Sequence, residues 1–295
     1  MFDRIFADYL LKSGKLSQEQ LNLVFETQEK KRARLGVIAV SEQLMTVEQA
    51  EEVNQLQAVC DKRFGDIAVE KGYLTDEQVS RLLSLQGNLY LSFVQSIVDN
   101  ELLSMQEINE AQEQYQRENS FTLMDMENLK SCDIDRTTPI FLHGQSELLT
   151  ALCGVMARTT VRLVDYHAYM KKPYIAKEVP IQYFSMQELF GDHNIITAIT
   201  GPADAMKQAA IGFAGEQYIS DEEDALDAIC ELINCVNGLF ATDMSLRNIE
   251  VDMKAPYYQA KEGILTADSL LCLPIIVSGK EITLITAIDT EYSIK

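Results

Sequence analysis

The sequence repeats itself every 29 residues through its first 116 positions, and this period limits the fold more than any other feature. An apolar residue followed by Ser or Thr recurs at that spacing, and a Glu-Gln pair follows it in three of the four copies. Several positions that recur together indicate a repeated structural unit that is stabilised by stacking on its neighbours. The aligned pairs are Leu16-Ser17, Met45-Thr46, Leu74-Thr75 and Leu103-Ser104.

Each copy predicts a pair of helices. In the third copy, a short helix is expected from Phe64 to Lys71, with a turn at Gly72. Thr75 precedes two acidic residues and is expected to cap a second helix over 77–86, because its hydroxyl can accept a backbone hydrogen bond and acids are favoured at the positive helix end. No proline interrupts residues 1–138. Residues 1–116 are therefore expected to form an all-α bundle of helical hairpins.

The pattern changes after this region, and all six prolines lie beyond residue 138. Residues 117–138 lose clear periodicity and end in Thr-Thr-Pro, so we expect a linker, in which Leu123 and Leu129 could form a short extra helix. Residues 139–295 alternate between helical and β-rich segments. They predict an α+β domain with a mostly antiparallel sheet covered by two principal helices.

Individual elements of this second domain are expected from periodicity and turn residues. The segment 207–218 is ambiguous, although its two glycines and its mix of Ala, Ile and Phe favour a strand. Ser220 and Asp221 are expected to cap a long helix whose first turn is acidic. The expected helices cover 145–158 and 221–239, and the expected strands cover 159–165, 194–200, 207–218, 270–277 and 281–289, with a hairpin turn at 278–280.

Charge and composition exclude several classes of protein. The chain has 25 basic and 45 acidic residues, a net charge of −20, so a chain-wide nucleic-acid or anionic-membrane binder is not expected. No apolar run reaches the roughly 20 residues that span a bilayer, and the first residues do not resemble a secretory signal. Six scattered cysteines and three histidines indicate reduced thiols in a cytoplasmic protein without a metal centre.

The helix expected at 221–239 carries a polar stripe. Asp227, Glu231 and Asn234 are spaced by four and three residues and share one face, while apolar side chains occupy the other side. Such a stripe is also typical of a solvated helix face. A rigid helix would hold this stripe in place, and the Asn amide offers both a hydrogen-bond donor and an acceptor.

The spacing of this stripe resembles the signature of the chemotaxis phosphatases CheC, CheX and FliY: Asp or Ser, three residues, Glu, two residues, Asn, and Pro after 22 more. Asp227, Glu231 and Asn234 match it, and Pro256 follows after 21 residues, one fewer than in the family. A glycine-bearing strand expected over 210–217 and a Leu-x-x-Pro strand at 271–274 also fit. The resemblance covers residues 140–295.

One copy of the signature is present. Glu147 and Thr150 stand where a second Glu-x-x-Asn would lie, so the arrangement is similar to the single-copy CheX rather than to CheC.

The resemblance implies hydrolysis of the aspartyl phosphate on a response-regulator receiver of the CheY type. Asn234 would position the attacking water, Glu231 would pair with the receiver's lysine, and Asp227 would support them. Mg²⁺ would belong to the receiver, so no intrinsic cofactor is expected, and a homodimer through this domain is implied. The alternatives are a non-catalytic signalling adaptor and a protein that responds to c-di-GMP.

Two copies of the 29-residue repeat carry a further motif. Arg34-Leu35-Gly36 and Arg63-Phe64-Gly65 are aligned, and each is followed by Gln 23 residues after its Arg. They resemble the N-terminal helical domain of type II secretion and type IV pilus ATPases, where paired motifs bind c-di-GMP in some members. Arg34, Gly36, Arg63 and Gly65 are therefore candidate ligand-binding residues, and the basic run 30–34 is a candidate phosphate contact. Alternatively, they mark a helix start and a close packing contact.

Overall fold

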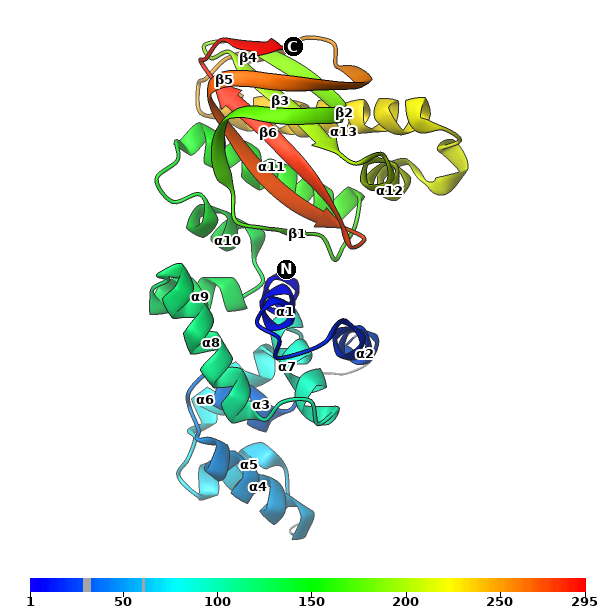
Figure 1. Ribbon diagram of the computed structural model, residues 1–295. Coiled ribbons are helices and arrows are strands. Elements are labelled where there is room, and N and C mark those ends of the chain that lie inside the picture. Colours follow the sequence, from blue (N-terminus) through cyan, green and yellow to red (C-terminus); the bar gives the residue numbers. More distant parts are fainter. Residues whose placement is uncertain (29–32, 60–61) are drawn as a thin grey trace. The chain divides into compact units, whose positions relative to one another are not determined.

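The computed structural model describes residues 1–28, 33–59 and 62–295 and divides into two compact units (Figure 1). One unit spans Phe2–Asp133 and the other Ile134–Lys295. Most of the basic run 30–34 lies outside the described residues.

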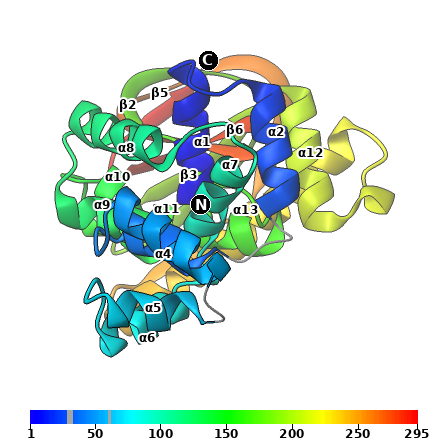
Figure 2. The same cartoon turned by 90° about the horizontal axis from the view of Figure 1, so that it is seen from below.

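The N-terminal unit is all-helical in its described residues, as the repeat predicts. Figure 1 shows that its helices are short, and Figure 2 shows α5 and α6 side by side. Its helices are α1 (Phe2–Lys12), α2 (Gln18–Gln28), α3 (Leu35–Ser41), α4 (Val47–Val59), α5 (Phe64–Glu70), α6 (Asp76–Ser84), α7 (Leu89–Asp99), α8 (Met105–Asn119) and α9 (Leu123–Lys130).

The helix bounds in this unit follow the spacing of the sequence. Helices α3 and α5 begin 29 residues apart, and the expected short helix and its turn at Gly72 are confirmed. Thr75 caps α6, with its hydroxyl accepting from the Gln78 amide at 3.2 Å while the Gln78 side chain accepts from the Thr75 amide at 2.8 Å. Ser104, 29 residues later, forms the same reciprocal pair with Glu107. These caps satisfy amides that would otherwise lack partners at the helix start.

Most of the segment 117–138, where we expected a linker, is helical. Helix α8 continues to Asn119, Thr122 caps α9, and α10 (Ile134–Phe141) encloses Pro139. A helix this short buries only one or two side chains, here Met126 and Leu129 in α9, so no period is visible in the sequence. The extra helix considered for this segment is confirmed, and the two units divide inside it, after Asp133.

The C-terminal unit is built on an antiparallel sheet, as expected. In the described chain the strand order is β1-β5-β6-β3-β2-β4, with β7 paired to β5. Strand β2 also pairs with β5, so β5, β6, β3 and β2 close on themselves and leave few free edges. The strands are β1 (Tyr169–Met170), β2 (Tyr174–Gly191), β3 (Ile195–Gly201), β4 (Val251–Met253), β5 (Tyr257–Val277), β6 (Lys280–Ile288) and β7 (Tyr292–Ile294).

Helices cover one face of this sheet. Figure 1 shows α11 (Glu147–Leu163) and α13 (Glu222–Leu246) on the same side, and α12 (Ala203–Ala214) packs against α13. Side chains alternate along β2, where buried Ser185 faces the helices and donates to the Leu226 carbonyl of α13 at 2.8 Å. Phe184 and Met186 point the other way, into an apolar cluster enclosed by the closed strands.

Two expected strands of this unit are helical. Residues 159–163 form the end of α11. Residues 207–214, which include most of the segment 210–217, lie in α12, and Glu216–Tyr218 form a 3₁₀ turn. Their β-branched residues and glycines favoured strands, but the two segments pack on each other. A Cβ on Gly212 would lie 2.5 Å from the Val164 carbonyl oxygen, so glycine permits the close approach.

The other expected elements are confirmed with changed bounds. Helix α13 starts at its Asp221 cap and runs to Leu246, and the hairpin at 278–280 joins β5 to β6. The long strand β2 and the first half of β5 were not expected from the sequence.

Within the described chain, α13 is the helix with the length and apolar content to cross a membrane. In this structure 56% of its most apolar 18-residue stretch is buried within the unit, as is typical of the core helix of a folded domain.

The substitution Gly212→Ala tests the packing of α12. Its new methyl group meets a backbone carbonyl, so we expect the free energy of unfolding to fall by about 1–3 kcal/mol. Gly238→Ala in α13 is the matched control, because its Cβ would lie 3.8 Å from the nearest atom; it is expected to be neutral or to stabilise by up to about 1 kcal/mol. Denaturant unfolding of both variants measures the effect, and equal stabilities would contradict this account.

Candidate functional site

Helix α13 is fixed at its start and along one side. Asp221 accepts from the Asp224 amide at 2.9 Å, and the acidic first turn lies at the positive end of the helix. The side chains on its apolar side are fully buried against the sheet: Ile229, Leu232, Ile233, Val236 and Phe240. The helix is therefore a rigid support for the residues on its outer side.

The predicted stripe lies on this outer side. Asp227 and Glu231 are exposed, and Asn234, one turn after Glu231, is half-buried. Within the described part of the chain, the Glu231 carboxylate has no hydrogen-bond or ion-pair partner. The structure therefore places the three predicted residues on one face, with an unpaired carboxylate beside an amide.

Asn234 is held from beneath by Gln187 of β2, which is 1% exposed. The Gln187 Nε2 donates to Asn234 Oδ1 at 2.9 Å and to the Lys254 carbonyl at 2.8 Å. The Gln187 Oε1 accepts from Asn237 Nδ2 at 2.9 Å. One buried amide thus joins the helix, the strand and the segment before β5.

Pro256 of the signature lies in the short connection between β4 and β5. Lys254, in the same connection, is tied to Glu188 by its amide at 2.9 Å and by its ammonium group at 2.7 Å. These contacts hold the connection beside the end of the stripe, where the Lys254 carbonyl meets Gln187.

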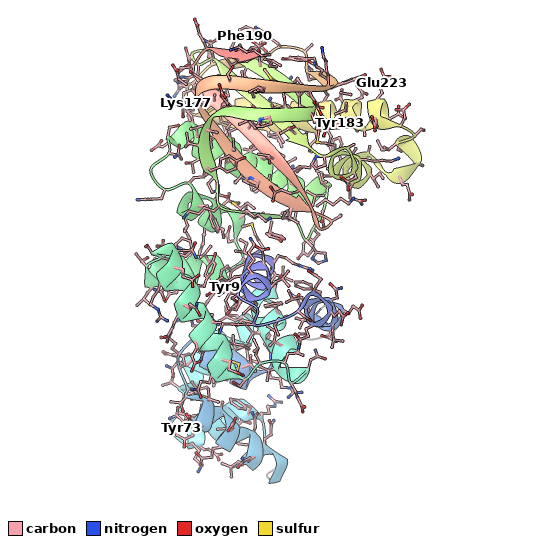
Figure 3. All side chains as sticks on the ribbon, in the orientation of Figure 1. Tyr9, Tyr73, Lys177, Tyr183, Phe190 and Glu223 are labelled. Carbon is pink, nitrogen blue, oxygen red and sulfur yellow. The ribbon has the colours of Figure 1, made fainter. Side chains whose placement is uncertain are left out.

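The surroundings of the stripe are acidic. The Tyr258 hydroxyl donates to Glu223 (labelled in Figure 3) at 2.8 Å, and this bond, followed by burial and the nearby Glu223 and Asp227 charges, raises the pKa of Tyr258. Burial is the main cause that raises the pKa of the Cys230 thiol, with smaller contributions from Asp227 and Glu231. An accumulation of negative charge on an exposed helix face favours a cationic partner.

The position of the second signature copy offers no comparable group. Glu147 begins α11, and the Thr150 hydroxyl is bonded to the Ser146 carbonyl of its own helix at 3.0 Å. A threonine cannot supply the amide geometry of Asn.

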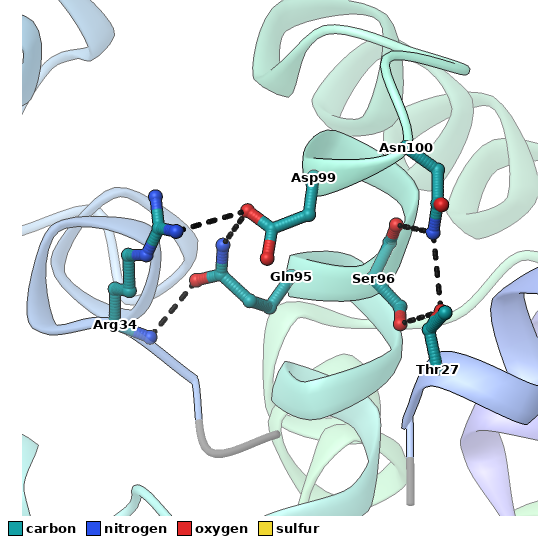
Figure 4. A network of polar contacts seen from close by, with 6 residues as sticks. All are labelled: Thr27, Arg34, Gln95, Ser96, Asp99 and Asn100. Carbon is teal, nitrogen blue, oxygen red and sulfur yellow. Dashed lines mark hydrogen bonds and ion pairs between the residues drawn. The ribbon is translucent and has the colours of Figure 1, made fainter. Parts of the chain in front are cut away.

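The N-terminal candidates lie at helix starts, as the alternative interpretation expects. Arg34 and Arg63 are the N-cap residues of α3 and α5. The Arg34 amide donates to Gln95 Oε1 at 2.9 Å, and its guanidinium lies 3.6 Å from Asp99, next to a second set of polar contacts around Thr27 (Figure 4). Exposed pairs of this kind contribute little stability.

Both motif glycines are close packing contacts. A Cβ on Gly36 would lie 3.0 Å from the Phe64 ring, and one on Gly65 would lie 2.8 Å from Val79 and 3.8 Å from Leu35. The two Arg-x-Gly motifs therefore pack against each other, and each glycine lies too close to a neighbouring side chain for a larger residue to fit without a shift.

Gln187 and the Lys254 carbonyl were not identified from the sequence. A polar residue every second position in a strand usually faces solvent, so the pattern around Ser185 and Gln187 does not reveal burial. Among residues 1–28, 33–59 and 62–295, no group of three or more His, Cys, Asp or Glu side chains could hold a metal ion.

Residues 183–286 match the family model described as chemotaxis phosphatase CheX. A comparison with curated protein sequences gives no match. The matched segment lies in the C-terminal unit and includes Asp227, Glu231 and Asn234.

Similar solved structures include chemotaxis proteins CheX from Desulfovibrio desulfuricans and Vibrio vulnificus, at 13% and 14% identity, with TM-scores of 0.44 and 0.41. Each alignment covers 49% of this chain and 100% of the other. A CheX-CheY-BeF3-Mg+2 complex from Borrelia burgdorferi is similar at 16% identity and a TM-score of 0.39, over 50% of this chain and 98% of that chain.

Glu188 provides a test of how the connection beside the site is held. Hydrogen bonds from Lys254 and, to a smaller extent, from Tyr292 lower the pKa of the Glu188 carboxyl. Its ionised form therefore stabilises the fold at neutral pH. This contribution is lost as pH falls through the lowered pKa. Glu188→Gln is expected to lower the free energy of unfolding by about 0.5–1 kcal/mol at pH 7.

The difference should begin to fall near the usual carboxyl pKa of about 4.3 and should vanish only below the lowered pKa of Glu188, as followed by denaturant unfolding from pH 7 downward. Glu250→Gln is the control, because the exposed Glu250 carboxylate has no partner among the described residues. A difference that is constant over this range would contradict the role of the ion pair.

Proposed function

We propose that the segment 183–286, which matches the family model of chemotaxis phosphatase CheX, hydrolyses the aspartyl phosphate on a response-regulator receiver of the CheY type. The observation that carries the proposal is the placement of Glu231 and Asn234 one turn apart on the outer side of a helix whose other side is fully buried. The chemistry requires water to attack phosphorus while the bond to the aspartyl oxygen breaks, which yields inorganic phosphate and a free carboxylate.

Asn234 is suited to positioning that water. Phosphoryl transfer has a loose, in-line transition state, so placement of the nucleophile matters more than a strong base. The amide is restrained by Gln187, yet it keeps its N–H groups and one lone pair for the substrate side.

Glu231 is suited to docking the receiver. Its carboxylate is exposed and unpaired within the described chain, and Asp227 adds a second negative charge one turn earlier. A lysine at the phosphorylation site of a receiver would form a charge-assisted hydrogen bond with Glu231. Mg²⁺ would be held by the receiver as part of the substrate. A cytoplasmic location and a homodimer through this unit stay predictions.

Release of phosphate from phosphorylated receivers tests the proposal. The double substitution Glu231→Ala/Asn234→Ala is expected to reduce the catalysed rate by about 100-fold or more, because both the docking charge and the positioned amide are lost. Glu147→Ala/Thr150→Ala is the matched control on α11 and should leave the rate unchanged.

Wild type that binds a receiver without accelerating phosphate release would overturn the phosphatase function in favour of a signalling adaptor. An active Glu231→Ala/Asn234→Ala variant would overturn the assigned site.

A second candidate function is binding of c-di-GMP by the N-terminal unit. The favouring observation is that the two Arg-x-Gly motifs pack against each other, which brings the starts of α3 and α5 together. Arg can pair with phosphate and stack on a base.

Calorimetry with c-di-GMP tests this candidate. Binding by wild type that is lost in Arg34→Ala/Arg63→Ala is expected, while Arg117→Ala, which changes an exposed arginine of α8, should bind normally. The absence of heat with wild type would remove the candidate and leave the packing role of the two glycines.

A further inference from the structure

Gln187 is a fully hydrogen-bonded amide in the core beneath the proposed site. It is 1% exposed, and its three hydrogen bonds occupy both N–H groups and the carbonyl oxygen. Burial of an amide is costly unless its groups are paired. A side chain bonded at both ends therefore keeps one orientation.

The backbone carbonyl of Lys254 determines the orientation of the Gln187 side-chain amide. The Lys254 carbonyl can only accept a hydrogen bond, so the nitrogen of Gln187, rather than its oxygen, must face it at 2.8 Å. The same nitrogen lies 2.9 Å from Asn234. Asn234 must therefore turn its Oδ1 toward the sheet, and Asn237 must offer its Nδ2 to the oxygen of Gln187.

The consequence appears on the outer side of α13. In a planar amide the C=O and C–N bonds diverge from one carbon, so with Oδ1 bonded to Gln187 the Nδ2 of Asn234 is directed away from that contact. Asn234 is half-buried, and within the described residues its Nδ2 has no hydrogen-bond partner. The groups left for a substrate are two N–H donors and the second lone pair of Oδ1.

From this geometry we infer that Gln187 is a positioning residue, which fixes Asn234 with its N–H groups toward the phosphoryl group and the attacking water. The inference rests on the proposed phosphatase function. An N–H group that donates to the water oxygen occupies one lone pair and leaves the other free to attack phosphorus. Without Gln187 the amide could rotate and present its oxygen, which would place the water differently.

The substitution Gln187→Glu reverses the polarity of this contact. A carboxylate accepts from the Asn234 Nδ2 instead of donating to its Oδ1, so the Asn234 amide is expected to turn over. At pH 7.5 we expect kcat for phosphate release to fall by about 100-fold, with KM within about twofold of wild type because Glu231 still docks the receiver. As pH falls and the new carboxyl is protonated, it can donate again, and kcat should partly recover.

Ser185→Ala is the matched control. Ser185 lies two residues earlier on β2, is fully buried and also donates to α13, but at the Leu226 carbonyl. Its loss removes a hydrogen bond between strand and helix without touching Asn234, so kcat and its pH profile should stay as in wild type. Equal kcat values for Gln187→Glu and Ser185→Ala, or parallel pH profiles, would overturn the positioning role.

A second measurement does not depend on activity, and its wild-type part needs no Gln187 variant. The Asn234 side-chain amide signals of the full chain are identified in NMR spectra by their loss in Asn234→Asp. In wild type they should exchange rapidly with water, as expected for N–H groups that face outward, and exchange should slow in Gln187→Glu. Protected signals in wild type would overturn the inference. If wild type shows no phosphatase activity, the proposed function fails, while this measurement still decides the orientation of Asn234.

Discussion

A glutamine amide buried between α13 and β2 links the core of the C-terminal unit to the residues on its surface. An apolar side chain could fill the same space, but it would leave the Lys254 carbonyl, Asn234 and Asn237 with unpaired groups, each at a cost of about 1–3 kcal/mol. The complete set of bonds to Gln187 therefore does more than stabilise packing. It also makes the orientation of the Asn234 amide, on the outer side of α13, depend on a fixed backbone carbonyl.

The rest of the unit keeps this arrangement rigid. The strands β5, β6, β3 and β2 close on themselves, and the apolar side of α13 is fully buried on the resulting sheet. Groups held within a fraction of an ångström by such a scaffold can position a water without a strong base. Under the proposed function, the acidic outer face attracts and docks a cationic surface of the receiver.

The placement of the candidate site residues on one helix face could be predicted because it follows local rules. The Asp221 cap marks the start of α13, and helix spacing alone places Glu231 and Asn234 on one face. Gln187 could not be predicted, since β2 was not recognised and an alternating polar residue does not show whether it is buried. The same limit explains why strands were predicted at 159–165 and 207–218, which are mostly helical. Their β-branched residues and glycines form packing contacts between these two segments. Each error arose where tertiary packing, rather than local preference, decided the structure.

The most direct test of the account is a crystal structure of the full chain bound to a receiver activated with beryllium trifluoride. We expect α13 at the phosphorylation site, Glu231 paired with a receiver lysine, and Nδ2 of Asn234 about 3 Å from a water that faces the beryllium. A receiver bound through another surface, or an Asn234 whose Oδ1 faces the phosphoryl mimic while Gln187 bonds elsewhere, would contradict it.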